Sequence, residues 1–308
     1  MKTYLFIVLA LCFGSSFAQQ EYLSEEINIT PLVTGTLLLP DTEANPPLVV
    51  IIGDSGPMDR DGNQQMMKNN AMRFLAEGLY EKGIASFRYD KRLIKIMKRG
   101  RVDERAIEFD HFIEDAIAVT TYFKDDSRFS KLYVLGHGQG SLVGMIAANG
   151  LADGYISVAG AGQELDDMIV DQIANQSPGL TDNARQSFDD LRANGVAMNY
   201  SEGLASIFRP DIQPFLFSWM QYDPQEEIVK LQIPVFIIMG DKDLQVRVSE
   251  GELLHNAKPE ARYEVIKNMN HIFKEIKGND IENSKSYNEY NRPVMPELVN
   301  MISDFIKE

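Results

Sequence analysis

The segment that most constrains the fold lies between residues 132 and 148, where a strand pattern changes within a few residues into a helix pattern. Residues 132–135 form an apolar run typical of a strand covered on both faces. A second apolar run, residues 142–148, has the composition of a buried helix. Because glycine has no Cβ atom, it suits a turn in which backbones approach closely. Glycines occupy alternate positions between the two runs: Gly136, Gly138 and Gly140.

Strand and helix patterns alternate along most of the chain, and this alternation predicts an α/β fold with a mainly parallel, eight-stranded sheet and right-handed crossovers. The first two strands, around Pro31, are expected to be antiparallel. The expected strands are 25–30, 32–39, 48–52, 84–89, 132–135, 155–161, 234–239 and 263–266. The expected helices of the core are 66–82, 103–125 (with Ile117 and Tyr122 on its buried side), 249–257 and 296–307. The polar segment 277–293 has no periodicity and is expected to be a surface loop.

The alternation stops between residues 163 and 231, where helical patterns follow one another without a strand. Such an insertion predicts a helical cap over the strand ends. Its aromatic side chains have two interpretations: they line an apolar acyl pocket, or they pack the cap onto the core. The expected helices are 165–175, 181–194 (with Thr181 as its cap), 201–208 and 213–222, and the aromatic residues are Phe215, Phe217, Trp219 and Tyr222.

The N-terminal residues have the features of a secretory signal peptide: the basic Lys2, an apolar run over residues 4–13 and small residues up to Ala18. We expect cleavage after Ala18, a mature domain over residues 19–308 that includes the helical insertion, and a secreted or periplasmic location. A membrane anchor is disfavoured because a spanning helix needs about 20 apolar residues.

The chain is acidic, with a formal net charge of −15 at pH 7. A surface of this sign repels polyanions, so nucleic acid and anionic membranes are not expected partners. Cys12 is the only cysteine and lies in the expected signal peptide, so the mature chain uses no disulfide. A lipoprotein would be modified at Cys12, but Leu11 occupies a place where a small residue is expected. The sequence leaves the oligomeric state open.

The turn at Gly138 resembles the nucleophile elbow G-x-S-x-G of the α/β-hydrolase superfamily, but here it reads G-H-G-Q-G. The superfamily has the chain order nucleophile, acid, histidine. Asp243 follows an apolar strand and matches the acid loop, with Asp241 as its competitor. His271 follows the last strand and matches the histidine loop. A lone histidine is usually structural, but this place after the acid loop favours a role at the site. The resemblance therefore implies Gly138 at the nucleophile position, with Asp243 and His271 as the other triad members.

The loop of residues 53–63 follows the strand at 48–52, where the superfamily places one oxyanion-hole donor. The resemblance implies the backbone N–H groups of Ser55 and Gln139 as donors. Three residues of this loop, Asp59, Asp61 and Asn63, can also be read as a calcium loop, but Asn70 stands where its closing glutamate would fall. Structural roles are the preferred interpretation, with Arg60 paired to a carboxylate.

Four histidines are present, and none lies in a cluster with metal-ligand spacing, so no catalytic zinc and no cofactor is expected. His137, beside the elbow, is expected to pack or to orient the turn. Together the motifs resemble a group of secreted, esterase-like bacterial α/β-hydrolases. That group has a G-S-G-P-x-D-R-D-G-N oxyanion loop, a G-H-S-x-G-S elbow and an N-H-x-F-K histidine loop, and residues 89–92 also fit it. The resemblance implies hydrolysis of small carboxylic esters through an acyl-enzyme.

Gly138 removes the hydroxyl on which that chemistry depends. Ser141 lies one helical turn further on, and Ser55 lies in the oxyanion loop, so neither is an expected substitute. Three interpretations follow: an esterase scaffold that is weakly active or inactive, slow hydrolysis by a water that His271 activates in the vacated space, or a non-catalytic binding protein for a small acyl or ester ligand.

Overall fold

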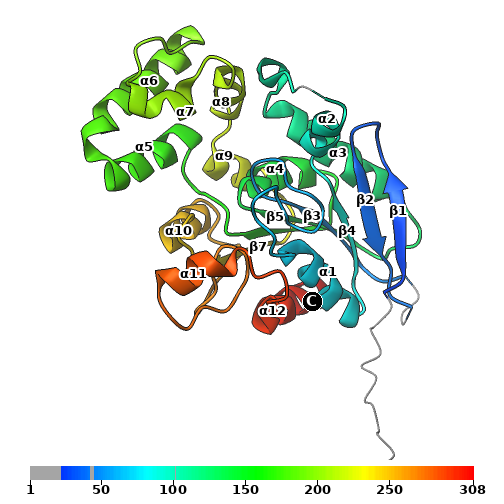
Figure 1. Ribbon diagram of the computed structural model, residues 1–308. Helices are drawn as coiled ribbons and strands as arrows, with labels where there is room; N and C mark the ends of the chain where they lie inside the picture. Colours follow the sequence, from blue (N-terminus) through cyan, green and yellow to red (C-terminus); the bar gives the residue numbers. More distant parts are fainter. Residues whose placement is uncertain (1–21, 42–44, 101) are drawn as a thin grey trace, which may run out of the picture.

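The computed structural model describes residues 22–41, 45–100 and 102–308, and its centre is an eight-stranded sheet (Figure 1). The strand order is β1-β2-β4-β3-β5-β6-β7-β8. Strand β2 pairs antiparallel with both β1 and β4, and every pairing from β4 to β8 is parallel. The strands are β1 (Ser24–Asn28), β2 (Thr34–Leu38), β3 (Leu48–Ile52), β4 (Ala85–Tyr89), β5 (Leu132–His137), β6 (Gly154–Val158), β7 (Val235–Gly240) and β8 (Arg262–Ile266).

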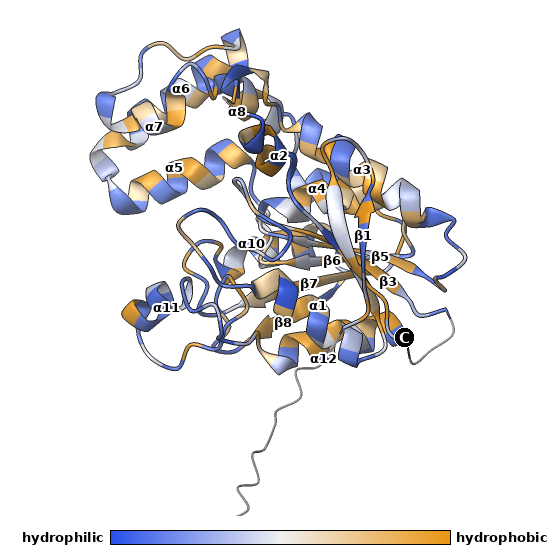
Figure 2. Cartoon of the chain, turned by 45° about the vertical axis from the view of Figure 1, so that its right-hand side comes forward, coloured by the Kyte–Doolittle hydropathy of each residue, from blue (hydrophilic) through white to orange (hydrophobic). Residues whose placement is uncertain are grey.

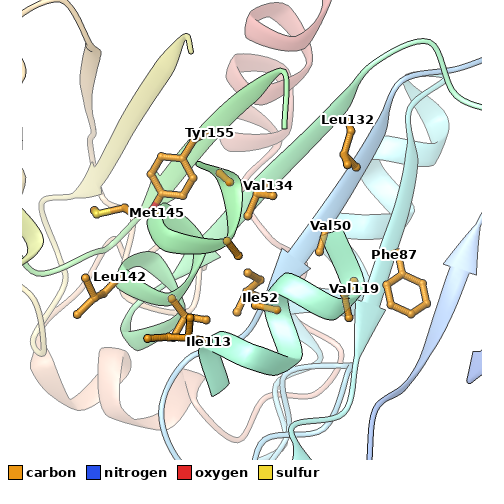
Figure 3. Close-up of a cluster of buried hydrophobic side chains, with 14 of the residues drawn as sticks. Val50, Ile52, Phe87, Ile113, Val119, Leu132, Val134, Leu142, Met145 and Tyr155 are labelled. Atoms are coloured by element: carbon orange, nitrogen blue, oxygen red, sulfur yellow. The ribbon is translucent and has the colours of Figure 1, made fainter. Parts of the chain in front are cut away.

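Helices cover both faces of this sheet, which explains why its central strands are continuous apolar runs. One face packs on α3 (Asp110–Lys124) and α4 (Gln139–Ala148), and Figure 3 shows part of that core, with Val50, Val134 and Leu142 among its side chains. The other face packs on α1 (Ala71–Glu81) and α12 (Pro296–Lys307). The remaining core helices are α2 (Arg92–Lys98), the short 3₁₀ helix η1 (Glu104–Ala106), α10 (Val248–Ala257) and α11 (Asp280–Ser286).

Residues 163–231 form a layer of helices on one side of the sheet, at the upper left of Figure 1. This layer has its own hydrophobic core, and in Figure 2 its helices α5 and α6 carry alternating hydrophobic and hydrophilic bands, as helices with one buried face do. Thr181 lies inside α6 and does not cap it. The layer consists of α5 (Leu165–Gln176), η2 (Pro178–Leu180), α6 (Thr181–Asn194), η3 (Glu202–Leu204), α7 (Ala205–Phe208) and α8 (Gln213–Trp219). It is followed by α9 (Pro224–Val229), whose Ile228 belongs to the core of the sheet.

Two helix predictions and one loop prediction for the core were wrong in part. Helix α1 begins at Ala71, because Asn63 accepts hydrogen bonds from the backbone of residues 69 and 70 and holds the preceding segment in a turn. The expected helix 103–125 divides into η1 and α3, and both Ile117 and Tyr122 face outward. The expected loop 277–293 contains α11, whose polar residues Asn283 and Ser286 are buried.

The expected signal peptide and Cys12 lie outside the described residues. Within the described ranges, no helix combines the length and the apolar character needed to cross a membrane.

Candidate active site

The turn between β5 and α4 has the geometry of a nucleophile elbow. Gly138 has φ 55° and ψ −120°, a backbone conformation that is strained for any residue with a Cβ atom. A Cβ atom at Gly136 would lie 2.2 Å from the carbonyl oxygen of Gly140, and one at Gly140 would lie 2.5 Å from that of Ile52. The flanking glycines therefore allow the helix to pack directly on the strand ends, and the turn presents position 138 to the space above the sheet.

Two loops bring an acid and a histidine to this turn. Asp243 follows β7, and its Oδ2 lies 2.7 Å from Nδ1 of His271, which is 2% exposed. The other oxygen of Asp243 accepts the backbone N–H groups of Gln245 and Val246, which fixes the carboxylate. Asp241, the competing candidate, instead accepts the backbone N–H of Asn268. The contact with the imidazole is therefore made by Asp243.

The space that a serine side chain would occupy is filled by the carboxylate of Asp54, which sequence reasoning missed. Its Oδ2 lies 3.0 Å from Nε2 of His271, and its Oδ1 accepts the backbone N–H of Gln139 at 2.8 Å. A Cβ atom at Gly138 would lie 2.1 Å from that same Oδ1. The expectation of a vacated slot in which His271 activates a water was therefore wrong. One signal was available: the G-S-G-P motif begins with glycine where this chain has Asp54.

The expected oxyanion-hole residues lie beside this carboxylate. Ser55 and Gln139 both line the cavity at the elbow, but the N–H of Gln139 is already bonded to Asp54. Lys91 holds the two segments together, because its Nζ donates to the backbone oxygen of Asp54 at 2.7 Å and to Oε1 of Gln139 at 2.6 Å. The N–H of Gln139, one of the two expected donors, is thus occupied from within the chain.

Charge is concentrated at the imidazole. Burial alone lowers the pKa of His271, but the charges and hydrogen bonds of Asp243 and Asp54 outweigh it and raise the pKa to about 10. Burial likewise raises the pKa of Asp54, yet the hydrogen bond from His271 and its positive charge hold it well below its usual range. At neutral pH the site is therefore an imidazolium between two carboxylates.

His137 lies under the site, with its Nε2 2.8 Å from the backbone oxygen of His271. Its ring packs 4.6 Å from the His271 ring, and burial lowers its pKa to about 4, so it is neutral at pH 7. It thus positions the histidine loop.

Residue spacing along the sequence indicated no metal site, but the fold brings one ligand atom each from Asp54, His137 and His271 within 4.8 Å of one another. Zinc binds such donors. A metal ion bound to Nε2 of His271 would have to replace the hydrogen bond between His271 and Asp54.

A cavity of about 280 Å³ opens above Asp54 and His271, between the core and the cap. Trp219 lines it and also stacks on Phe109 of the core, with ring centroids 4.9 Å apart, so this residue contributes both to the cavity wall and to the packing of the cap onto the core. Phe215 and Tyr222 contact the ring of Phe109 and pack the cap onto the core. The remaining lining combines apolar side chains with uncharged amides: Leu142, Leu165, Met168, Ile169 and Val246, and Gln163, Gln172 and Gln245.

The acidic residues of the 53–63 loop have structural partners. Asp59 accepts the backbone N–H groups of residues 61 and 63, and Asp61 pairs with Arg88 at 3.1 Å. Arg60 pairs with Asp90 at 2.8 Å.

Ser141 is 1% exposed and its hydroxyl lies 2.7 Å from that of Ser157. It is therefore turned into the core and away from the cavity.

The parallel sheet, the elbow and the loops at its strand ends together define the α/β-hydrolase fold. By sequence, the chain is similar to the esterase EstD of Thermotoga maritima, with 28% identity over 232 residues, 71% of this chain and 52% of that protein. The chain thus spans about half the length of this curated relative. No family model matches the sequence.

Solved structures show the same fold. Est1E from Butyrivibrio proteoclasticus superposes with a TM-score of 0.57 at 15% identity, over 92% of this chain and 99% of Est1E. A bromoperoxidase from Bacillus anthracis superposes with a TM-score of 0.51 at 16% identity, over 93% of this chain and all (100%) of that one.

Proposed function

We propose that the chain is a serine-hydrolase-type carboxylic ester hydrolase scaffold that lacks its nucleophile hydroxyl and is weakly active or inactive toward esters. The observation that carries the proposal is the Asp243–His271 pair, 2.7 Å apart, directed at an elbow whose central residue is Gly138. Similarity to esterase EstD supports the ester-hydrolase class.

The filled oxyanion hole explains why ester hydrolysis should be slow. A serine hydrolase without a triad member keeps roughly 10³–10⁴-fold catalysis over water, from its oxyanion hole and binding. Here the N–H of Gln139 already donates a hydrogen bond to Oδ1 of Asp54, so an ester carbonyl oxygen has no free access to that donor. Even this residual catalysis requires Asp54 to move.

A small, uncharged ester suits the cavity best. Away from Asp54 and His271 its lining is mostly apolar and amide, and its volume of about 280 Å³ limits the ligand to a small molecule. Est1E, a structural neighbour with a TM-score of 0.54 in this form, has been solved with ferulic acid bound.

The test is to restore the hydroxyl with and without removing Asp54. Gly138→Ser alone should remain slow, because its Cβ would lie 2.1 Å from Oδ1 of Asp54. Gly138→Ser combined with Asp54→Gly should raise kcat/KM for p-nitrophenyl acetate by about 100-fold or more, since loss of the serine in subtilisin costs about 10⁶. Asp54→Gly alone is the matched control. A folded double variant as slow as the parent would remove the assignment of the triad.

The alternative is a non-catalytic binding protein for a small acyl or ester ligand, which the intact cavity and the internally occupied hole also favour. The two proposals differ in the effect of His271→Gln. If His271→Gln leaves both the calorimetric affinity for ethyl butyrate and the turnover at the level of the unmodified protein, the binding proposal is favoured.

We further propose a secreted or periplasmic location, based on the signal-peptide pattern that ends at Ala18. The mature N-terminus of the chain expressed in a bacterial host, read by mass spectrometry, tests it.

A further inference from the structure

We propose that Asp54 is a carboxylate nucleophile that displaces a leaving group from a saturated carbon, so that the site hydrolyses short alkyl halides. This activity goes beyond the ester hydrolysis considered above and uses the same cavity.

The position of Asp54 is the first support. The carboxylate occupies the place where a serine at position 138 would put its side chain, 2.1 Å from the ideal Cβ position. It lies at the floor of the cavity, with its side chain 13% exposed. Lys91 fixes its backbone oxygen at 2.7 Å, and the two carboxylate oxygens are bonded to different partners.

The filled oxyanion hole indicates which reaction suits this carboxylate. Oδ1 is the oxygen held by the N–H of Gln139, so the hole serves the carboxyl group of Asp54 and not a substrate carbonyl. Displacement at a saturated carbon produces no oxyanion on the substrate and needs no such donor. The oxyanion arises later, on Asp54 itself, when water attacks its ester.

His271 fits the second step. While Asp54 is charged, two carboxylates keep the imidazole protonated. Alkylation converts Asp54 into a neutral ester and removes one of these charges, which lowers the pKa of His271 and allows it to act as a base. The first step thus prepares the base for the second.

The balanced sequence is as follows. Oδ2 of Asp54 forms a bond to the alkyl carbon while the carbon–halogen bond breaks and halide leaves with the electron pair. With Asp54 esterified, the imidazolium of His271 loses its Nε2 proton to solvent. Water then attacks Cγ of the aspartyl ester as Nε2 takes a proton from it, and the Cγ–alkoxy bond breaks as that proton passes to the leaving oxygen and releases the alcohol. The carboxyl group of Asp54 that remains gives its proton back to His271. The net reaction converts alkyl halide and water into alcohol, halide and a proton.

The cavity favours a halide as leaving group. Apart from Asp54 and His271, the polar side chains that line it in the described chain are Ser55, Trp219 and glutamines, which solvate an anion but do not protonate a basic leaving group. Its apolar walls suit a short alkyl chain.

The experiment uses 1-bromobutane with the full mature chain. The parent should release bromide, and one turnover in H₂¹⁸O should place ¹⁸O in Asp54 and leave ¹⁶O in the butanol. His271→Gln should accumulate a butyl adduct, located at Asp54 by peptide mass spectrometry. Asp54→Asn should give neither, while Glu252→Gln, at an exposed carboxylate of α10, should behave as the parent.

Three results would overturn the proposal: no bromide release by the folded parent, ¹⁸O in the alcohol and not in Asp54, or an adduct at any other residue. If His271→Gln does not fold, the isotope result in the parent decides. The p-nitrophenyl acetate assay of the double variant at positions 54 and 138 is independent of bromide release, so the failure of either proposal is recognisable by itself.

Discussion

The imidazole of His271 lies between Asp243 and Asp54, at 2.7 and 3.0 Å. Replacing Asp54 by Asn removes one of the two negative charges, and we expect the pKa of His271 to fall by about 1–3 units from its value of about 10. Measurement of the ring ¹⁵N shifts against pH tests this. Asp241 contacts the backbone of Asn268 and not the imidazole, so Asp241→Asn is the matched control and should leave the titration of His271 unchanged.

The same pKa predicts how stability depends on pH. Folding raises the pKa of His271 from 6.5 to about 10, so its contribution is complete below pH 6.5 and is lost as the pH rises toward 10. Folding lowers the pKa of Asp54 from 3.8, so that contribution is present above pH 3.8 and is lost in acid. The difference in unfolding free energy between the parent and Asp54→Asn should therefore be largest near pH 5–6 and shrink on either side. Urea denaturation at pH 3, 5.5 and 10 measures it, and a difference independent of pH would contradict the ion pair.

Asp243 and His271 were predictable from the sequence because each follows an expected strand in the chain order that the resemblance implies, and parallel strands end at one edge of a sheet. Asp54 also follows such a strand. Its contact with Gly138 was not predictable, because it depends on the course of the loop and on the missing side chain at the elbow.

Lys91 connects the loop after β3 to the start of α4. Replacing it by Met leaves the backbone oxygen of Asp54 and Oε1 of Gln139 without their charged donor. We expect a loss of about 1–3 kcal/mol in unfolding free energy, the usual cost of buried groups left unpaired. Guanidinium denaturation measures it. Lys98→Met, at an exposed position of α2, should stay within about 0.5 kcal/mol, and an equal loss in both variants would contradict the connecting role.

Helix α11 illustrates which elements the sequence conceals. Its segment is polar apart from Ile281, which is exposed, so no apolar periodicity marks it. Its buried side chains instead make hydrogen bonds: Asn270 donates to Asn283 at 2.9 Å and to Ser286 at 2.8 Å. Helix α12 was predictable because its apolar residues recur at helical spacing, and α4 because a continuous apolar run follows the glycine turn.

At the scale of the whole molecule, the cap and the sheet have separate hydrophobic cores, and contacts such as the stacking of Trp219 on Phe109 connect them. The insertion was predictable from the interruption of strand patterns. Which of its aromatic residues line the cavity and which pack on the core was not predictable, because the same helix face contributes to the cavity wall and to the core contacts.

The separate hydrophobic cores predict that the cap unfolds before the sheet. Phe188 is fully buried in the cap core, at 0% exposure, and its replacement by Ala should cost about 3–5 kcal/mol of local stability. Amide hydrogen exchange should quicken in α5, α6 and α8 and stay slow in β3, β5 and β7. Val229→Ala, at an exposed position of α9, is the control and should leave the exchange of both parts unchanged. Equal loss of protection in cap and sheet would show that they unfold as one cooperative unit, because local opening of the cap would then cost as much as global unfolding.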